Sequence, residues 1–133
     1  MNGRKPMISV RPASRSDRAD LAQIREQALD QGDIDPSVLD TAARTAPDVF
    51  HTDTVPSALF ACEHPHVLVA ERGERSIGWA VVYTEVSPVA FVFVGDSNLA
   101  SQVDERLVEQ ARAVAEDGGI DSLLVIVFRA PRE

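Results

Sequence analysis

Apolar residues recur along the chain with two different periods, and together these periods predict five strands and three helices. In the strand-like segments, short apolar runs or alternating positions are bounded by Pro, Gly or charged residues. In the helix-like segments, apolar residues recur every three or four positions between a Ser, Asp or Pro start and a Gly or Pro stop. The predicted elements are, in order, a strand at 7–10, helices at 14–32 and 35–47, strands at 67–70, 76–84 and 89–94, a helix at 103–117 and a strand at 122–128.

Two runs in the second half of the chain, 89–94 and 122–128, are apolar at nearly every position, which is typical of strands buried on both faces. A helix with an apolar stripe from Val103 to Val114 lies between them. A strand, a helix and a second buried strand form a right-handed βαβ unit, so we expect two adjacent parallel strands. The strands at 67–70 and 76–84 flank a polar turn and predict a hairpin.

Composition narrows the classes of protein that the chain can belong to. Its 133 residues and 14.4 kDa suit one domain, which we place at 7–128, between a flexible N-terminus at 1–6 and a short tail at 129–133. The net charge of -8 argues against a nucleic-acid partner, because such proteins need a basic face. No apolar run reaches the ~20 residues of a membrane span and no signal peptide is evident, so we expect a cytoplasmic protein without a membrane partner.

This order of elements, together with particular motifs, resembles the GNAT acyltransferase superfamily over residues 7–128. Residues 8–13 (ISVRPA) and the helix that follows Asp17 are similar to the family's opening strand and first helix. Residues 67–82 (VLVAERGERSIGWAVV) resemble its central hairpin, where a glycine precedes an aromatic residue, here Gly78 and Trp79. The resemblance implies an α/β fold with a mixed sheet, of order β-α-α-β-β-β-α-β, that ends after strand five.

The resemblance also implies acetyl-CoA as cofactor, with its pantetheine arm in a gap between the strands at 89–94 and 122–128. In the family, the loop after the first of these strands reads Arg/Gln-x-x-Gly-x-Gly/Ala, and its amides at a helix N-terminus hold the diphosphate. Here Leu99 takes the Arg/Gln position, and Gln102 and Asp104 take the glycine positions. The residues implied to contact the cofactor are Phe93, Val94, Gln102, Val103 and Asp104.

The acidic residues at the predicted start of this helix change the expected affinity. Asp104 and Glu105 add negative charge near a diphosphate, which opposes its binding. The same carboxylates also stabilise a helix N-terminus without any role in chemistry, and this is the more common use of such residues. We therefore expect acetyl-CoA to bind weakly, with a Kd above about 0.1 mM.

Two residues near the end of the hairpin are candidates for acid–base chemistry. Glu85 lies where the resemblance implies the acceptor amine, and a carboxylate there can act as a general base. Tyr83 is the only tyrosine of the chain, and the family often uses a tyrosine as the acid. The structural alternatives are that Glu85 is an exposed residue at a strand end and that Trp79 belongs to the core rather than to an acceptor pocket.

Residues 48–65 form a long irregular connection, in which a short helix at 56–62 is expected. His64 and His66 form a His-x-His pair that can bind Zn²⁺, but a site needs three or four ligands. We therefore interpret them as surface histidines and predict no metal. The single cysteine, Cys62, excludes an intrachain disulfide, and a buried hydrophobic role is favoured over a nucleophilic one.

The family continues after strand five with a helix and a hairpin, whereas this sequence ends at residue 133. The open edge of strand five predicts a homodimer through residues 122–133. Two functions remain open. The chain is either an N-acetyltransferase that moves an acyl group from acetyl-CoA to an amine, or a catalytically inactive GNAT-like module that acts through self-association or a protein partner.

Overall fold

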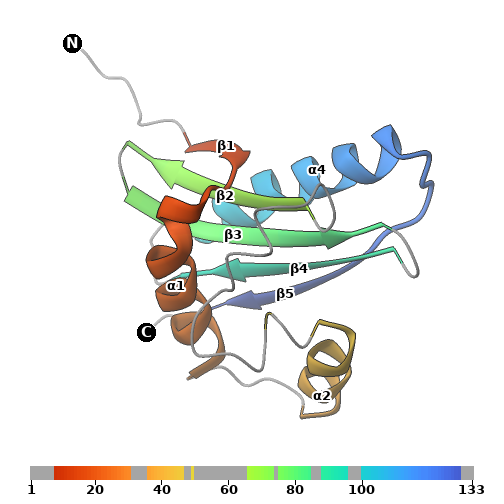
Figure 1. The fold of residues 1–133 in the computed structure, drawn as a ribbon, viewed down its shortest axis with the longest axis horizontal. Helices are drawn as coiled ribbons and strands as arrows, with labels where there is room; N and C mark the ends of the chain where they lie inside the picture. The colour runs from red at the N-terminus through yellow and green to blue at the C-terminus, as the bar shows by residue number, and fades with distance from the viewer. Residues whose placement is uncertain are drawn as a thin grey trace.

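A five-stranded mixed sheet with helices on both faces forms the molecule (Figure 1). The computed structural model describes residues 8–30, 36–46, 49, 66–73, 75–84, 88–95 and 100–129. Its elements are β1 (Ile8–Pro12), the 3-10 turn η1 (Arg15–Asp17), α1 (Arg18–Asp30), α2 (Pro36–Thr45), β2 (His66–Arg72), β3 (Arg75–Tyr83), β4 (Val89–Val94), α4 (Ala100–Asp117) and β5 (Leu124–Arg129).

Each strand lies beside its neighbours in the sequence, in the order β1-β2-β3-β4-β5. The strands β1 to β4 are antiparallel, and β4 and β5 are parallel and joined by α4. The predicted parallel pair is therefore confirmed, with Val89 opposite Leu124 and Val94 opposite Arg129. The predicted order of strands and helices is confirmed as well, with the addition of η1 before α1.

The hairpin of β2 and β3 is tighter than the sequence predicted. Its strands reach into the polar segment, so that β2 ends at Arg72 and β3 begins at Arg75. Gly73 in this turn has φ 64°, a backbone conformation that glycine adopts without steric cost. The polar residues of the segment had suggested a longer turn, but exposed strand ends also carry polar side chains.

Two other boundaries differ from the predicted ones. α4 begins at Ala100, three residues before Val103, the first residue of its apolar stripe. β5 begins at Leu124, two residues later than predicted. The predicted helix at 56–62 lies outside the described residues.

Two hydrophobic cores lie on opposite faces of the sheet. On one face α1 covers a core rich in aromatic side chains, and on the other face α4 covers a core of smaller aliphatic ones. The core beneath α1 includes Leu21, Ile24, Ala28, Val69, Trp79, Val81, Phe91, Phe93 and Phe128. The core beneath α4 includes Ala80, Val82, Val92, Val94, Val103, Leu107, Ala111 and Ala115.

Close packing of α4 on the sheet depends on Gly78. A Cβ atom at this position would lie 2.6 Å from Val103 Cγ1 and 3.0 Å from the Phe93 carbonyl oxygen. Only a residue without a side chain lets the helix approach this closely. Because the rest of α4 is polar, it is amphipathic, and none of the described helices is long and apolar enough to cross a membrane.

The two strands that were predicted to be buried on both faces differ in exposure. β4 is buried at all six positions, as predicted. β5 is only partly covered: Leu124 is 61% exposed and the side chains of residues 125–127 are half-buried. The physical reason is position, since among the described strands β5 has a neighbour on one side only. The apolar pattern of β5 is typical of burial on both faces, and its place at the edge of the sheet explains why this burial is incomplete in the single chain.

Candidate functional site

The candidate site lies at the C-terminal end of β4 and the N-terminus of α4. The β3–β4 ladder continues one residue past Val94, because the Gly95 N–H donates to the Ile77 carbonyl oxygen at 3.1 Å. α4 then begins at Ala100 and runs for 18 residues. The first turn of such a helix has unpaired amides and the positive end of the helix dipole, which together attract anions.

Asp104 and Glu105 do not lie at the helix start, contrary to the prediction. α4 has no acidic residue in its first turn, and Asp104 is its fifth residue. The amide of a fifth residue is bonded within the helix, so Asp104 cannot offer a free N–H as the second glycine of the family motif does. Gln102 is exposed in the first turn, and its backbone amide is among those available to an anion.

The other three predicted cofactor residues are buried. Phe93, Val94 and Val103 each have 0% exposure. Val94 and Val103 belong to the core beneath α4, and Phe93 belongs to the core beneath α1. The structure therefore brings these residues to the same end of the sheet, but their side chains pack inside the protein.

An aromatic stack crosses the sheet where the resemblance implied a gap. The rings of Trp79 and Phe93 stack at a centroid distance of 4.7 Å, and those of Phe93 and Phe128 at 5.5 Å. These residues come from β3, β4 and β5, and the pairing of β4 with β5 continues to Val94 opposite Arg129. The facing edge of β4 is thus occupied by β5. In this structure the paired strands leave no gap between them for a pantetheine arm.

Trp79 belongs to the core and not to an acceptor pocket. Its side chain has 0% exposure, and its Nε1 has no hydrogen-bond partner among the described residues. An unpaired buried donor of this kind costs about 1–3 kcal/mol. Its stacking on Phe93 and its burial offset that cost.

Tyr83 lies at the far end of β4 from α4. It pairs with Val89, whereas the helix follows Val94. Five residues of strand separate these positions by roughly 17 Å at about 3.3 Å per residue. Tyr83 is half-buried and its ring meets Phe91 edge to face at 6.2 Å. The structure therefore does not bring Tyr83 to the predicted cofactor residues, and Glu85 lies outside the described residues.

The residues of the possible metal site are mostly outside the described part of the chain. His64 and Cys62 lie in the segment 50–65, and only His66, at the start of β2, is described. Within the described ranges, no three His, Cys, Asp or Glu residues are grouped in a way that could hold a metal ion.

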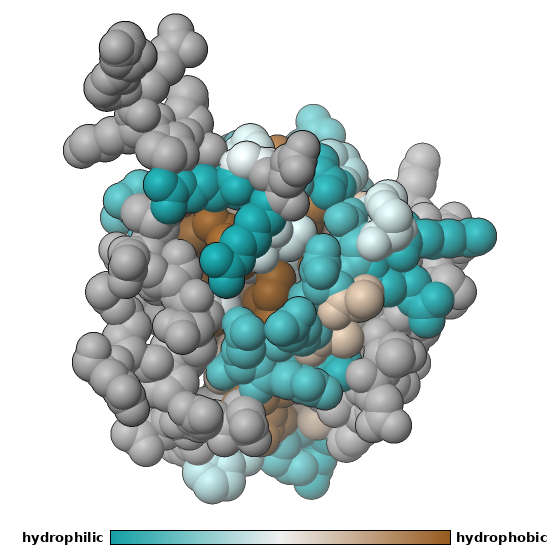
Figure 2. All heavy atoms as spheres, turned by 90° about the vertical axis from the view of Figure 1, so that its left-hand side faces the viewer, coloured by the Kyte–Doolittle hydropathy of each residue, from teal (hydrophilic) through white to brown (hydrophobic). Residues whose placement is uncertain are grey.

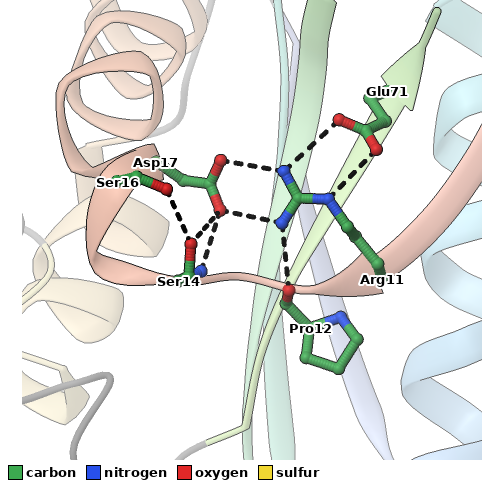
Figure 3. Close-up of polar contacts among 6 residues, drawn as sticks. All are labelled: Arg11, Pro12, Ser14, Ser16, Asp17 and Glu71. Atoms are coloured by element: carbon green, nitrogen blue, oxygen red, sulfur yellow. Dashed lines mark hydrogen bonds and ion pairs between the residues drawn. The ribbon is translucent and has the colours of Figure 1, made fainter. Parts of the chain in front are cut away.

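A polar cluster that the sequence did not predict ties β1, η1 and β2 together (Figure 3). Arg11 donates from Nη1 and Nη2 to the two carboxylate oxygens of Asp17, both at 2.9 Å, and from Nε to Glu71 Oε1 at 3.0 Å. The Ser14 N–H donates to Asp17 Oδ2 at 2.8 Å, which caps the turn before α1. The sequence predicted a helix start at Ser14 and Asp17. It did not predict the hydrogen bond from Arg11 to Glu71, which lies 60 residues away.

The hydrogen bonds of the Arg11 guanidinium group change the pKa values in this cluster. The Arg11 guanidinium hydrogen bonds lower the pKa of the buried Asp17 carboxyl below its usual range. The bonds to Asp17 and Glu71 raise the pKa of Arg11 further above its already high value. Because every described charge in it is paired, the cluster is best interpreted as a clasp that joins the first strand to the first helix.

The fold is similar to those of several acetyltransferases, although no family model and no curated protein matches the chain by sequence. A GNAT family acetyltransferase from Brucella melitensis, solved with acetyl-CoA, has TM-score 0.61 at 14% identity and matches 91% of this chain and 76% of that one. A GCN5-related N-acetyltransferase from Ralstonia eutropha has TM-score 0.59 at 14% identity, over 93% and 84%. An aminoglycoside N-acetyltransferase in complex with CoA has TM-score 0.59 at 16% identity, over 95% and 80%. At this identity the likeness shows the fold, and the chain has the GNAT fold.

Proposed function

We propose that this chain is an N-acyltransferase that takes an acyl group from a CoA thioester and transfers it to an amine. The observation that supports this is the fold itself, shared over more than nine-tenths of the chain with acetyltransferases solved with CoA or acetyl-CoA. Fold alone does not establish chemistry. A second feature agrees with the proposal: β4 ends at Val94, the long helix α4 begins at Ala100, and the N-terminus of such a helix suits a diphosphate.

This function requires a change in the pairing of β4 with β5. The pantetheine arm needs the edge of β4 that β5 now occupies, so β5 has to part from the last residues of β4 when the cofactor enters. β5 is the less buried of the two strands, which favours such a movement. The free energy of separating the strands reduces the free energy of binding, and this adds to the weak affinity expected from Gln102 and Asp104 at the glycine positions.

Calorimetric titration with acetyl-CoA tests the proposal directly. We expect saturable binding with a Kd above about 0.1 mM, and release of free CoA thiol when a suitable amine is present. A panel of primary amines, including polyamines and peptide N-termini, covers the unknown acceptor. No saturable heat with acetyl-CoA and no thiol release with any amine would refute the proposal. Micromolar binding would support it and contradict the expectation of weak affinity.

A second candidate function is a non-catalytic module that acts through self-association. The observation that favours it is the continuous β4–β5 pairing together with the partly exposed β5, whose Leu124 is 61% exposed. In this case a second copy of the chain covers β5 through residues 122–133 in a two-fold dimer. Sedimentation at micromolar concentration together with the acetyl-CoA titration distinguishes the two functions. The non-catalytic module requires a dimer in sedimentation and no heat of binding with acetyl-CoA.

A further inference from the structure

A pocket between α1 and the sheet lies on the side of the molecule shown in Figure 2, where hydrophobic atoms are visible between hydrophilic ones. It encloses about 260 Å³. This is slightly less than the 300–1,000 Å³ typical of sites for drug-sized ligands, so the pocket suits a smaller molecule. Its described lining comes from one face of α1, the first three residues of β3 and the residue after β4: Asp20, Gln23, Ile24, Gln27, Arg75, Ser76, Ile77 and Gly95.

Two backbone features shape the floor of this pocket. Ala70 pairs with Gly78 and Glu71 with Ser76, so Ile77 is an extra residue in β3 and forms a β-bulge. Bulges of this kind redirect a strand and are common beside functional sites. At the end of β4, a Cβ on Gly95 would lie 2.8 Å from Gln27 Oε1. The missing side chain of Gly95 thus leaves room for the Gln27 side-chain oxygen beside the end of β4.

The walls carry one charge of each sign, and neither charge is neutralised within the described part of the chain. Asp20 projects from α1 and Arg75 from the start of β3, and they do not form an ion pair with each other. Neither side chain makes a hydrogen bond or ion pair among the described residues. Elsewhere in the chain, the Arg11, Asp17 and Glu71 charges are tightly paired. Asp20 and Arg75 are both exposed and line the pocket, so their charged groups are accessible to a ligand there.

We infer that this pocket binds a small zwitterion of the amino-acid class, with its ammonium group toward Asp20 and its carboxylate toward Arg75. The Asp20 carboxylate and the Arg75 guanidinium offer a partner of opposite charge to each of these groups, and the Gln23 amide supplies a neutral donor and acceptor. Ile24 offers an apolar contact for a hydrophobic side chain. A polyanion such as CoA does not suit the pocket, because Arg75 is its only described cation. The inference does not depend on the proposed acyl transfer.

The test uses L-leucine with two matched analogues and follows the amide signals of Gly95 and Ser76 by ¹H–¹⁵N NMR. N-acetyl-L-leucine lacks the ammonium group and L-leucinamide lacks the carboxylate. We expect L-leucine to shift both signals with a Kd of about 1 mM, and each analogue to bind about fivefold more weakly. Titration without acetyl-CoA keeps this result separate from the acyltransferase proposal.

Variants identify which side chain binds the ammonium group of the ligand and which binds its carboxylate. Asp20→Asn should weaken L-leucine about fivefold and remove the difference between L-leucine and N-acetyl-L-leucine. Arg75→Gln should weaken it equally and remove the difference between L-leucine and L-leucinamide. Asp121→Asn and Arg112→Gln, exposed and outside the pocket lining, are the controls and should change nothing. The inference is overturned if L-leucine does not shift Gly95 and Ser76, or if both pocket variants bind it as tightly as the wild type does.

Discussion

Replacement of Asp17 with asparagine measures what the clasp between β1 and α1 contributes to stability. Asp17 has 6% exposure, and its carboxylate accepts two hydrogen bonds from Arg11 at 2.9 Å and one from the Ser14 N–H at 2.8 Å. The amide nitrogen that the substitution introduces cannot accept a hydrogen bond, so one Arg11 bond and the ionic attraction are lost. A charged hydrogen bond contributes about 1.5–3 kcal/mol. Because the Arg11 side chain is 39% exposed and keeps Glu71, we expect a loss of about 2 kcal/mol.

Urea melts followed by the fluorescence of Trp79, the only tryptophan, provide the measurement. In a thermal melt of a chain of this size, the same loss of about 2 kcal/mol should lower the Tm by about 8 °C. The exposed pair of Arg44 and Asp40, at 3.1 Å on α2, gives the control: Asp40→Asn should cost at most about 0.5 kcal/mol. Equal losses in the two variants would refute the reasoning.

The effect of Asp17→Asn on stability should depend on pH. Since folding lowers the pKa of Asp17, its contribution is fully present above the unfolded value of about 3.9 and is lost as the pH falls through the folded pKa. The stability difference between wild type and Asp17→Asn should therefore shrink below about pH 4. A difference that stays constant down to pH 2 would show that the carboxylate charge is not its source.

Gly78→Ala should lower the free energy of unfolding by about 2 kcal/mol in urea melts, because the new Cβ would meet Val103 Cγ1 at 2.6 Å. Gly118→Ala, with 3.5 Å to its nearest neighbour, is the control, and equal effects would contradict the packing argument. Asp104→Asn should tighten acetyl-CoA binding about twofold in calorimetry, because it removes a charge one turn from the helix start, and an unchanged Kd would argue against a diphosphate there. Val125→Asp should return a dimer formed through β5 to 14.4 kDa in sedimentation, whereas a dimer that survives would have its interface elsewhere.

Regular elements could be predicted from the sequence wherever burial imposes a pattern. The run Val89–Val94 became a strand with the predicted bounds, because a strand buried on both faces must be apolar at every position. The first turn of α4 has no comparable apolar pattern. The predicted start at residue 103 was therefore three residues later than the observed start at Ala100. That error also put Asp104 at the wrong point of the helix.

The candidate site was less predictable, because it depends on features that no local pattern reports. The apolar pattern does not determine whether β4 and β5 pair fully or separate, because both arrangements suit the same apolar residues. The bulge at Ile77 follows from the register of β2 against β3. The bonds of Arg11 to Glu71 join positions 60 residues apart. The sequence contains all these residues, but their meeting requires the fold.

The order of the strands has a consequence for how the chain folds. Every described strand pairs only with the strands that directly precede or follow it in the sequence, so none of them has to insert between two that are already paired. The β2–β3 hairpin closes the shortest loop and loses the least chain entropy, so it is the natural place to begin. β4 can add to it directly, while β5 must wait for α4 to form and cross the sheet. We therefore expect β5 to join the sheet after β2, β3 and β4 have paired and, in the native protein, to separate before they do.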